Sequence, residues 1–535
     1  MPAKVAKAAK SPTKAKKART KRKPAKAALD RRTRSTPTPT AAPTEKLLDM
    51  QQAIELLKTT RPTFYRWLRT GKIRGMKVGR QWRFEPAEID RFLKGEAPRI
   101  ELRADIGPFV EELRKRAEAL GAPALPLPEE TDVQAAIAEI FRIGVAMRAT
   151  DVHIHPLAEE GSGARAAVVR YRVDGVLQRG VEFDIRLLAP VMQQWKAMGA
   201  CDPQQVKRPQ DARMMFEAGG ARIDLRLSFL PCAFGESLTV RILRPNGGII
   251  ALDDVGYADA DRDRLARALG SPWGLILLTG PTGSGKTTTL YACLSHVAGP
   301  EVKVLTIEDP VEYVFPWMIQ TQLDPAEGVS LARLARSALR ADPDVIMIGE
   351  LRDPETANLS LQAALTGHLV LTTLHANDTA RALVRLVEMD CPPFVVADAT
   401  KLVLSQRLVR LLCPHCSRET VVEPQRLARA GQLARTGGID WDALPKHFRA
   451  AVGCDQCKHL GYRGRNVVTE VLEVTPEIGQ ALRLRASVEE LRAIAVSQGM
   501  TTMAADGVRR AAAGETSLDE VLRVLAGLTG LELKT

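Results

Sequence analysis

A glycine-rich segment, Gly280-Pro-Thr-Gly-Ser-Gly-Lys-Thr287, constrains the fold of this chain more than any other feature of its sequence. It matches the spacing G-x-x-x-x-G-K-[ST], follows a short apolar run and precedes a segment that is predicted to be helical. Glycines let the backbone curl so that several N–H groups point at phosphate oxygens, and the positive end of the helix adds to the attraction. The sequence therefore predicts a loop that binds nucleotide phosphates. Its expected binding residues are Gly280, Pro281, Thr282, Gly283, Ser284, Gly285, Lys286, Thr287 and Thr288.

Charged and hydroxyl side chains near this loop are candidates for the chemistry of ATP. Lys286 would reach the β- and γ-phosphates, and the Thr287 hydroxyl would ligate the accompanying magnesium ion. Acids follow two later apolar runs, and the carboxyl ends of parallel strands converge on the ligand crevice. The acids are Glu308, Asp309 and Glu312 after one run, and Glu350 and Asp353 after the next. Glu350 is placed to polarise the attacking water.

Two histidines, His368 and His375, bracket a further apolar run, 369–372. A single histidine in a sequence is most often structural. A pair that frames one predicted strand beside a phosphate-binding loop favours a role in sensing phosphate. The sequence is compatible with both roles.

The apolar runs themselves indicate an α/β fold. The runs 275–278, 302–307, 345–348 and 369–372 are apolar on both faces and are separated by stretches with helical patterning. This pattern is typical of a parallel sheet that is covered by helices. No run approaches the roughly 18 to 20 apolar residues of a membrane-spanning helix, so any membrane role is expected to be peripheral.

The length of 535 residues predicts several domains. Shifts in composition and patterning place the boundaries between them. We expect a disordered basic tail at 1–44, a winged helix-turn-helix at 45–95, a helix and linker at 96–130, and an α+β domain at 131–247. A nucleotide-binding core at 248–410, a four-cysteine element at 411–470 and a helical region at 471–535 follow.

Four of the eight cysteines form two C-x-x-C pairs, Cys413 with Cys416 and Cys454 with Cys457. Four thiolates in two such pairs suit tetrahedral zinc better than a disulfide framework. The segment between the pairs is longer than usual, so we expect it to fold as a helical insertion whose ends the metal holds together.

Residues 47–94 have the pattern of two helices, a β-hairpin wing and a third helix. This pattern resembles the winged helix-turn-helix domains of the excisionase and MerR-like type, in which the second helix enters the major groove of DNA and the wing contacts the backbone. The resemblance implies DNA contacts for Thr63, Tyr65, Arg66 and Arg69 of the helix and for Lys77, Arg80 and Arg83 of the wing. A fold used only for protein contacts is the alternative.

The net charge of +13 resides in the N-terminal tail. Residues 1–34 contain 14 Lys or Arg and one acid, whereas the rest of the chain has 62 basic and 62 acidic residues. Such a tail is a solubilising segment, or a tether to DNA or anionic lipid through residues 1–94. The sequence does not choose between these partners.

The residues after about 131 carry a set of motifs with a family resemblance. They are Ala149-Thr-Asp-Val-His-Ile-His-Pro156, Arg172-Val-Asp-Gly175, Pro209-Gln-Asp-Ala-Arg213, the phosphate loop, Thr306-Ile-Glu-Asp-Pro-Val-Glu312, Arg340-Ala-Asp-Pro-Asp-Val-Ile-Met-Ile-Gly-Glu-Leu-Arg352 and Thr366-Gly-His-Leu-Val-Leu-Thr-Thr-Leu-His375. With them, the chain resembles the secretion ATPases that drive type II secretion and type IV pilus assembly. The resemblance implies a RecA-like P-loop core, with Glu350 as the catalytic glutamate. It also implies that Arg213 and Arg226 of the preceding domain reach the phosphates.

The resemblance further implies a cytoplasmic homohexamer at the periphery of the inner membrane, where it would move a platform protein. The cysteine element marks assembly and export motors rather than retraction motors in that family. One departure is Gly235-Glu-Ser237, where the family commonly has Gly-Glu-Arg. Another is the N-terminal docking domain, which the tail and winged helix replace. Two alternatives remain: a DNA-binding regulator or DNA-uptake ATPase acting through residues 1–94, and a relative that binds nucleotide without turnover.

Overall fold

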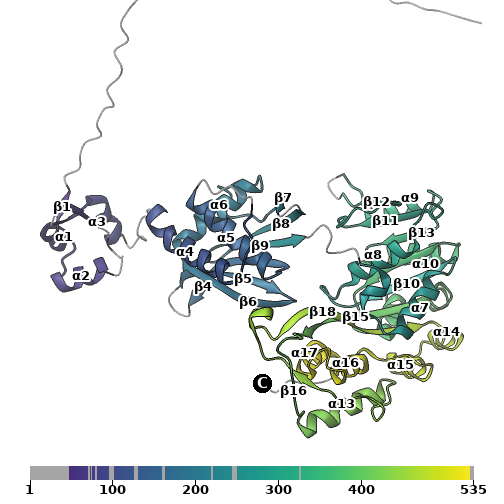
Figure 1. Cartoon of the computed structure of the whole chain (residues 1–535). Helices are drawn as coiled ribbons and strands as arrows, with labels where there is room; N and C mark the ends of the chain where they lie inside the picture. The colour runs from purple at the N-terminus through teal and green to yellow at the C-terminus, as the bar shows by residue number, and fades with distance from the viewer. Residues whose placement is uncertain are drawn as a thin grey trace, which may run out of the picture. The chain divides into compact units, whose positions relative to one another are not determined.

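The computed structural model separates the chain into two compact units, residues 1–99 and residues 100–535, which are described in turn (Figure 1). The structure describes residues 47–69, 73, 75–78, 81–94, 102–125, 131–159, 163–218, 221–243, 250–324 and 327–529. The basic tail predicted for residues 1–44 lies outside these ranges. The long, apolar helix that a membrane span requires is not found anywhere in them.

The first unit is a small α/β domain with its own core. A capping box at Asp49 begins its first helix, because the carboxylate accepts the backbone N–H groups of Gln51 and Gln52. Phe64 and Phe84 meet edge to face in the core, with ring centroids 5.1 Å apart. The elements are β1 (Leu48–Asp49), α1 (Met50–Leu56), α2 (Arg61–Arg69), β2 (Met76–Val78), β3 (Gln81–Phe84) and α3 (Pro86–Leu93), and the strand order is β1-β3-β2.

The second unit begins with helices packed on a six-stranded antiparallel sheet of order β6-β5-β4-β9-β8-β7. Its elements are α4 (Leu102–Ala119), α5 (Asp132–Ala146), β4 (Asp151–Glu159), β5 (Gly163–Val173), β6 (Val176–Asp184), α6 (Leu188–Met198), β7 (Gln210–Ala218), β8 (Ala221–Cys232) and β9 (Gly235–Leu243). The sequence predicts a helix that begins at Pro108, but α4 begins six residues earlier and contains this proline. Ile106 is fully buried in the core of this sheet, and its burial favours helix on both sides of Pro108.

A seven-stranded sheet follows, of order β12-β11-β13-β14-β10-β15-β18. All neighbouring pairs are parallel except β15 with β18. Its strands are β10 (Gly274–Thr279), β11 (Val304–Glu308), β12 (Met318–Gln322), β13 (Val345–Ile348), β14 (Leu369–Leu374), β15 (Thr400–Leu412) and β18 (Tyr462–Glu473), and its helices are α7 (Asp259–Leu269), α8 (Lys286–Val297), α9 (Leu331–Ala338), α10 (Pro354–Leu365), α11 (Thr379–Glu388) and α12 (Pro393–Ala399). Separate apolar clusters fill the two sides of the sheet, as the double-faced apolar runs predict.

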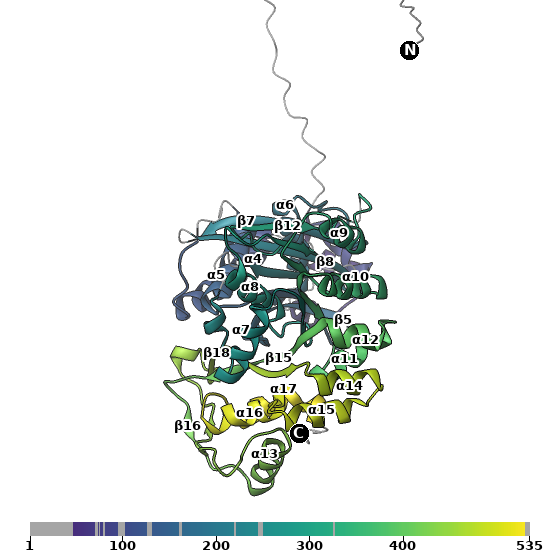
Figure 2. The ribbon, with the colours of Figure 1, turned by 90° about the vertical axis from the view of Figure 1, so that its right-hand side faces the viewer.

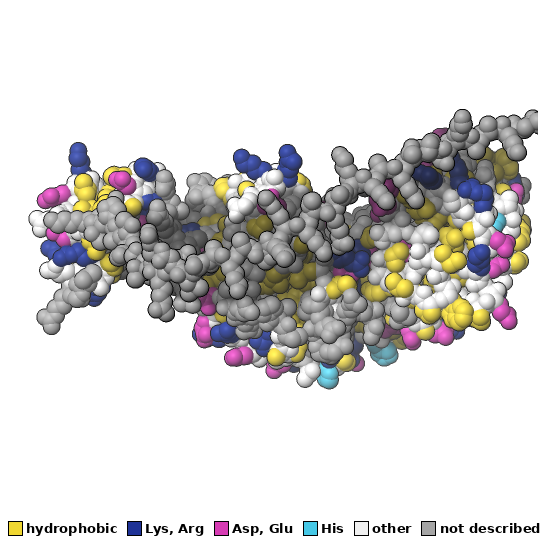
Figure 3. Space-filling model, turned by 90° about the horizontal axis from the view of Figure 1, so that it is seen from above, with side chains coloured by type: hydrophobic (Ala, Val, Ile, Leu, Met, Phe, Trp, Pro, Cys, Tyr) yellow, Lys and Arg dark blue, Asp and Glu magenta, His cyan; other side chains and the backbone are white. Residues whose placement is uncertain are grey.

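The C-terminal part combines a helical insertion with a group of helices against β15 and β18 (Figure 2). The insertion comprises β16 (Arg418–Glu419), α13 (Pro424–Thr436) and β17 (Arg449–Ala450), and the last helices are α14 (Pro476–Arg483), α15 (Val488–Ser497), α16 (Met503–Ala512) and α17 (Leu518–Thr529). In the view of Figure 3, Lys and Arg are interspersed with Asp and Glu on the described surface. This agrees with the balanced charge of the chain after residue 34.

Candidate nucleotide site and cysteine cluster

The glycine-rich loop connects β10 to α8, in the context that the phosphate-binding motif requires. Gly283 and Gly285 have φ angles of 80° and 91°, in the left-handed region that favours glycine. A Cβ atom on Gly280 would lie 2.5 Å from the carbonyl oxygen of Gln406, so no larger residue fits there. The loop therefore needs its glycines both for backbone conformation and for close packing on β15.

Lys286 is the first residue of α8. Its ammonium donates hydrogen bonds to the carbonyl oxygens of Gly280, at 2.7 Å, and Pro281, at 3.2 Å. Burial lowers the pKa of Lys286, and the nearby Glu350 carboxylate opposes this shift. The positive charge is thus held over the loop, where a phosphate group would be neutralised.

A cavity of about 530 Å³ opens beside the loop. Residues far apart in the sequence line it, because the carboxyl ends of β11, β13 and β14 meet the phosphate loop there. The residues that line the cavity include Thr150 and Leu243 of the preceding domain. The others include Thr282, Gly283, Ser284, Gly285, Lys286, Thr287, Thr288, Tyr291, Glu308, Asp309, Glu312, Glu350 and His375.

Glu350 lies at the centre of a charged cluster in this cavity. Its carboxylate is 3.2 Å from Nε2 of His375 and forms an ion pair with Arg352. Arg352 also reaches Asp309, with 3.0 Å between the charged atoms. The structure therefore brings together Asp309, Glu350 and His375, whereas Asp353 caps α10 by accepting the Thr356 N–H.

Glu308 and Asp309 are adjacent in sequence but differ in environment. Glu308 is only 4% exposed and accepts hydrogen bonds from the hydroxyls of Tyr291 and Thr306 and from the Gln320 amide. Three donors therefore hold this carboxylate in the cavity wall.

His368 does not belong to this cluster, so the structure brings only His375 of the two histidines to Glu350. It immediately precedes β14, whereas His375 immediately follows it. A strand of this length separates the two residues by about 20 Å, at roughly 3.3 Å per residue. Nδ1 of His368 lies 3.0 Å from the carbonyl oxygen of Ala363, at the end of the sheet opposite the phosphate loop.

The two arginines expected at the phosphates have carboxylate partners. Arg213 on β7 pairs with Asp224 on β8, its neighbour in the sheet. Arg226 on β8 donates to both carboxylate oxygens of Glu312, at 3.0 and 2.8 Å. Arg226 thus contacts a residue that lines the cavity directly, whereas Arg213 pairs with Asp224, and contact of either arginine with the phosphates stays a prediction.

Gln406 and Tyr291 were missed by the sequence analysis. Gln406 is fully buried on β15, accepts hydrogen bonds from Tyr257 and Thr289, and donates to the carbonyl oxygen of Ser284 in the loop. The available signal was the polar triplet Ser405-Gln-Arg407 between the apolar residues of β15, since a buried amide needs partners. Tyr291 carried no comparable signal, because its partners are distant in sequence.

Replacing Lys286 with Ala is expected to weaken ATP binding itself, since the ammonium at the loop is the main cationic contact for the phosphates. Titration of a fluorescent ATP analogue should show at least a tenfold rise in Kd. Lys303→Ala is the matched control, because Lys303 lies at the opposite end of the sheet, before β11. Equal affinities of the Lys286→Ala and Lys303→Ala proteins would contradict this role.

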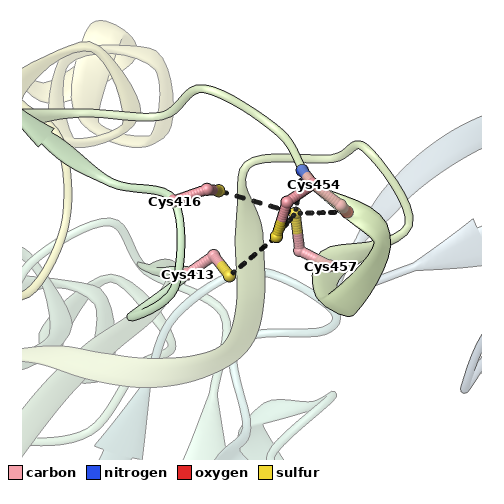
Figure 4. Close-up of side chains that lie close together, drawn as sticks. All are labelled: Cys413, Cys416, Cys454 and Cys457. Carbon is pink, nitrogen blue, oxygen red and sulfur yellow. Dashed lines mark hydrogen bonds between the residues drawn. The ribbon is translucent and has the colours of Figure 1, made fainter.

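The four paired cysteines converge at one place (Figure 4). Their sulfur atoms all lie within 4.8 Å of one another, with 3.9 Å between Cys413 and Cys454 and 3.8 Å between Cys416 and Cys457. A tetrahedral zinc ion with Zn–S bonds of about 2.3 Å requires sulfurs about 3.8 Å apart. The cluster therefore fits zinc, and α13 lies between the two pairs in sequence, as predicted.

In the first unit, the residues expected at DNA lie on α2 and on the wing. Thr63, Tyr65 and Arg66 are on α2, and Tyr65 is 44% exposed. Arg69 ends this helix, and Lys77 and Arg83 lie on β2 and β3. Arg80 lies outside the described residues.

Comparison with known proteins is decisive for the second unit. The family model described as Type II/IV secretion system protein matches residues 128–523. The chain belongs to this family. A separate model, described as a helix-turn-helix domain, matches residues 47–97, so the resemblances found in the sequence are both confirmed.

Curated members of the type II/IV secretion family extend the match. The chain is 38% identical over 420 residues to the type IV pilus assembly ATPase PilB of Thermus thermophilus, which covers 78% of this chain but 46% of that protein. It is 37% identical over 429 residues to type II secretion system protein E of Aeromonas hydrophila, covering 77% of this chain and 82% of that protein. The chain thus spans about half of the first relative and most of the second.

A solved structure supports the fold. The ATPase DotB of Legionella pneumophila superposes with a TM-score of 0.54 and 21% sequence identity, covering 73% of this chain and 95% of that chain. The predicted fold class, a P-loop ATPase core with a preceding α+β domain, is confirmed for this family member.

Proposed function

We propose that this secretion ATPase hydrolyses ATP as a homohexameric motor on the cytoplasmic face of the inner membrane, where it powers type II protein secretion or type IV pilus assembly. The observation that carries the proposal is the cluster of Glu350, His375, Arg352 and Asp309 beside the phosphate loop. The names of the related proteins support the two pathways. An inner-membrane platform protein is the proposed partner.

Different residues of the site bind the phosphates, hold the magnesium ion and accept the proton from water. Loop N–H groups and Lys286 bind the phosphates, and Thr287 would hold the magnesium ion, which neutralises developing charge when bound. Glu350 accepts the proton of the attacking water, and His375 and Arg352 orient its carboxylate. Zinc would be held by Cys413, Cys416, Cys454 and Cys457 and would serve the local fold.

The test is made in the cell. A strain whose chromosomal copy carries Glu350→Gln should lose either protein export into the medium or surface pili, and the lost process identifies the pathway. A copy with Glu301→Gln, an exposed acid at the opposite end of the sheet from the loop, should retain both. Normal export and normal piliation in the Glu350→Gln strain would contradict the proposal.

A second function, DNA binding, is favoured by the charge distribution of the first unit. The helix α2 has Arg61, Arg66 and Arg69 and no acid. The acids of the described part of this unit lie on or beside the other two helices, at Asp49, Glu55, Glu85, Glu88 and Asp90. Helix α2 itself is therefore basic and free of acids, as expected for an element that meets phosphates.

Replacing Arg66 with Ala in the full chain is expected to reduce discrimination between DNA sequences, with a loss of about 1 to 3 kcal/mol at preferred sites. If about six phosphates are contacted, log K should fall with log salt at a slope near minus five. Deletion of residues 1–34 should weaken all sites similarly and flatten that slope. Fluorescence anisotropy with duplex DNA measures both effects. Binding to anionic vesicles without binding to DNA would show that the winged helix has the fold of a DNA-binding domain but not its function.

A further inference from the structure

Tyr291 ties the helix that follows the phosphate loop to the acidic segment 308–312. It lies on α8, five residues after Lys286, and is 1% exposed. Its hydroxyl donates to the carboxylate of Glu308 and accepts the backbone N–H of Glu312 at 3.3 Å. One hydroxyl therefore spans both ends of the acidic segment.

The partners of Glu308 explain why the hydrogen bond from Tyr291 matters. Its Oε1 accepts from the Thr306 hydroxyl at 2.6 Å and from the Gln320 amide at 3.0 Å, whereas Oε2 accepts from Tyr291. These donors are all neutral. A carboxylate that is 4% exposed depends on each such donor, so loss of the tyrosine hydroxyl leaves Oε2 without the partner that the structure gives it.

Tyr291 also contacts the same segment through its aromatic ring. The Tyr291 ring lies 4.8 Å from that of Phe315 and 5.9 Å from that of Tyr313, centroid to centroid. Gln320 accepts the Phe315 N–H at 2.8 Å and donates to the Tyr313 carbonyl oxygen at 2.8 Å. The segment from Glu308 to Phe315 is thus folded around Tyr291 on one side and Gln320 on the other.

Asp309 and Glu312 both lie on this segment. Asp309 belongs to the charged cluster around Glu350, and Glu312 lines the cavity. Asp309 pairs with Arg352, which in turn pairs with Glu350. Glu312 pairs with Arg226 of the preceding domain. Displacement of the segment would therefore alter the alignment of Arg352 with Glu350 while leaving the loop glycines, Lys286 and Thr287 in place.

We propose that Tyr291 is a positioning residue for ATP hydrolysis: its hydroxyl fixes Glu308 and Glu312 to the phosphate-loop helix, so that Asp309 and Arg352 hold Glu350 in its working orientation. The proposal rests on the proposed ATPase function. It assigns Glu308 a supporting role through Tyr291 and Gln320, and it leaves proton acceptance to Glu350.

The first test compares Tyr291→Phe with Tyr313→Phe in the full chain. Both changes remove one hydroxyl from neighbouring rings, but among the described residues the Tyr313 hydroxyl has no hydrogen bond, so it is the matched control. Tyr291→Phe should lower kcat at least tenfold while KM and the Kd for a fluorescent ATP analogue stay within about twofold of the parent values. Tyr313→Phe should leave all three values near those of the parent.

The second test asks whether Tyr291 acts through Glu308. The double variant Tyr291→Phe, Glu308→Gln should be faster than the product of the two single losses predicts, because part of the effect of the hydroxyl passes through Glu308, whereas its contact with the Glu312 N–H is independent of that carboxylate. Independent, multiplicative losses would overturn the proposal. So would equal kcat values of Tyr291→Phe and Tyr313→Phe, or a parallel loss of kcat, ATP affinity and thermal stability.

Hydrogen exchange gives a measure that does not depend on turnover. Amides of residues 309–315 should exchange faster in Tyr291→Phe than in the parent, whereas those of β13 and β14 should be unchanged. Unchanged exchange in 309–315 would overturn the proposal. A parent protein that folds but fails to hydrolyse ATP would refute the proposed function, and the exchange comparison would still decide whether the Tyr291 hydroxyl holds residues 309–315 in place.

Discussion

Replacing Glu350 with Gln is expected to reduce kcat for ATP hydrolysis by about 10²- to 10⁴-fold, the usual contribution of a general base. The amide has nearly the same shape as the carboxylate but cannot accept a proton from water. The Kd for ATP should change little, because the phosphates are bound by the loop and by Lys286. Steady-state phosphate release and nucleotide titration on the purified chain measure the two quantities separately.

The control for this experiment is Glu301→Gln, which removes an equal charge at the opposite end of the sheet. It should hydrolyse ATP at the parent rate. A Glu350→Gln protein with the same kcat as this control would show that another group accepts the proton.

Removal of the metal from the cysteine cluster is expected to have the second large effect. Four thiolates that hold one zinc ion contribute on the order of 10 kcal/mol to their local fold. Cys416→Ser should lower the zinc content well below one ion per chain and should speed hydrogen exchange across residues 411–470. The strands β10 to β14 should keep their protection, because all four ligands follow them in the chain.

Cys232→Ser provides the matched control, since Cys232 is an exposed cysteine at the end of β8, outside the cluster. It should retain the full zinc content. Absence of zinc from the parent protein after purification under reducing conditions would contradict the assignment, and so would unchanged exchange in 411–470 after chelation.

Features that depend on local sequence were predicted well. The conformation of the phosphate loop is determined by glycines at positive φ and by the strand and helix around it. Residues 274–297 therefore include nearly all the residues that specify it. The strand β13 coincides with the predicted run 345–348, because residues apolar on both faces must be covered on both faces. The cysteine cluster followed from the chemistry of its ligands alone.

Features that depend on the position of a residue along a strand, or on distant partners, were predicted poorly. His368 and His375 are equally close to β14 in sequence, yet only the carboxyl end of the strand faces the phosphate loop. Gln406 and Tyr291 reach partners 15 or more residues away through the packing of β15, α8 and β11. Sequence spacing specifies neither the end of a strand that meets the ligand nor such long-range hydrogen bonds.

Magnesium-dependent ATP hydrolysis by the purified full-length chain, measured on the fraction that elutes as a hexamer, tests the central claim most directly. The account predicts steady phosphate release that requires magnesium and falls at least a hundredfold in Glu350→Gln. A hexameric parent protein that binds ATP but releases phosphate no faster than its Glu350→Gln variant would contradict it.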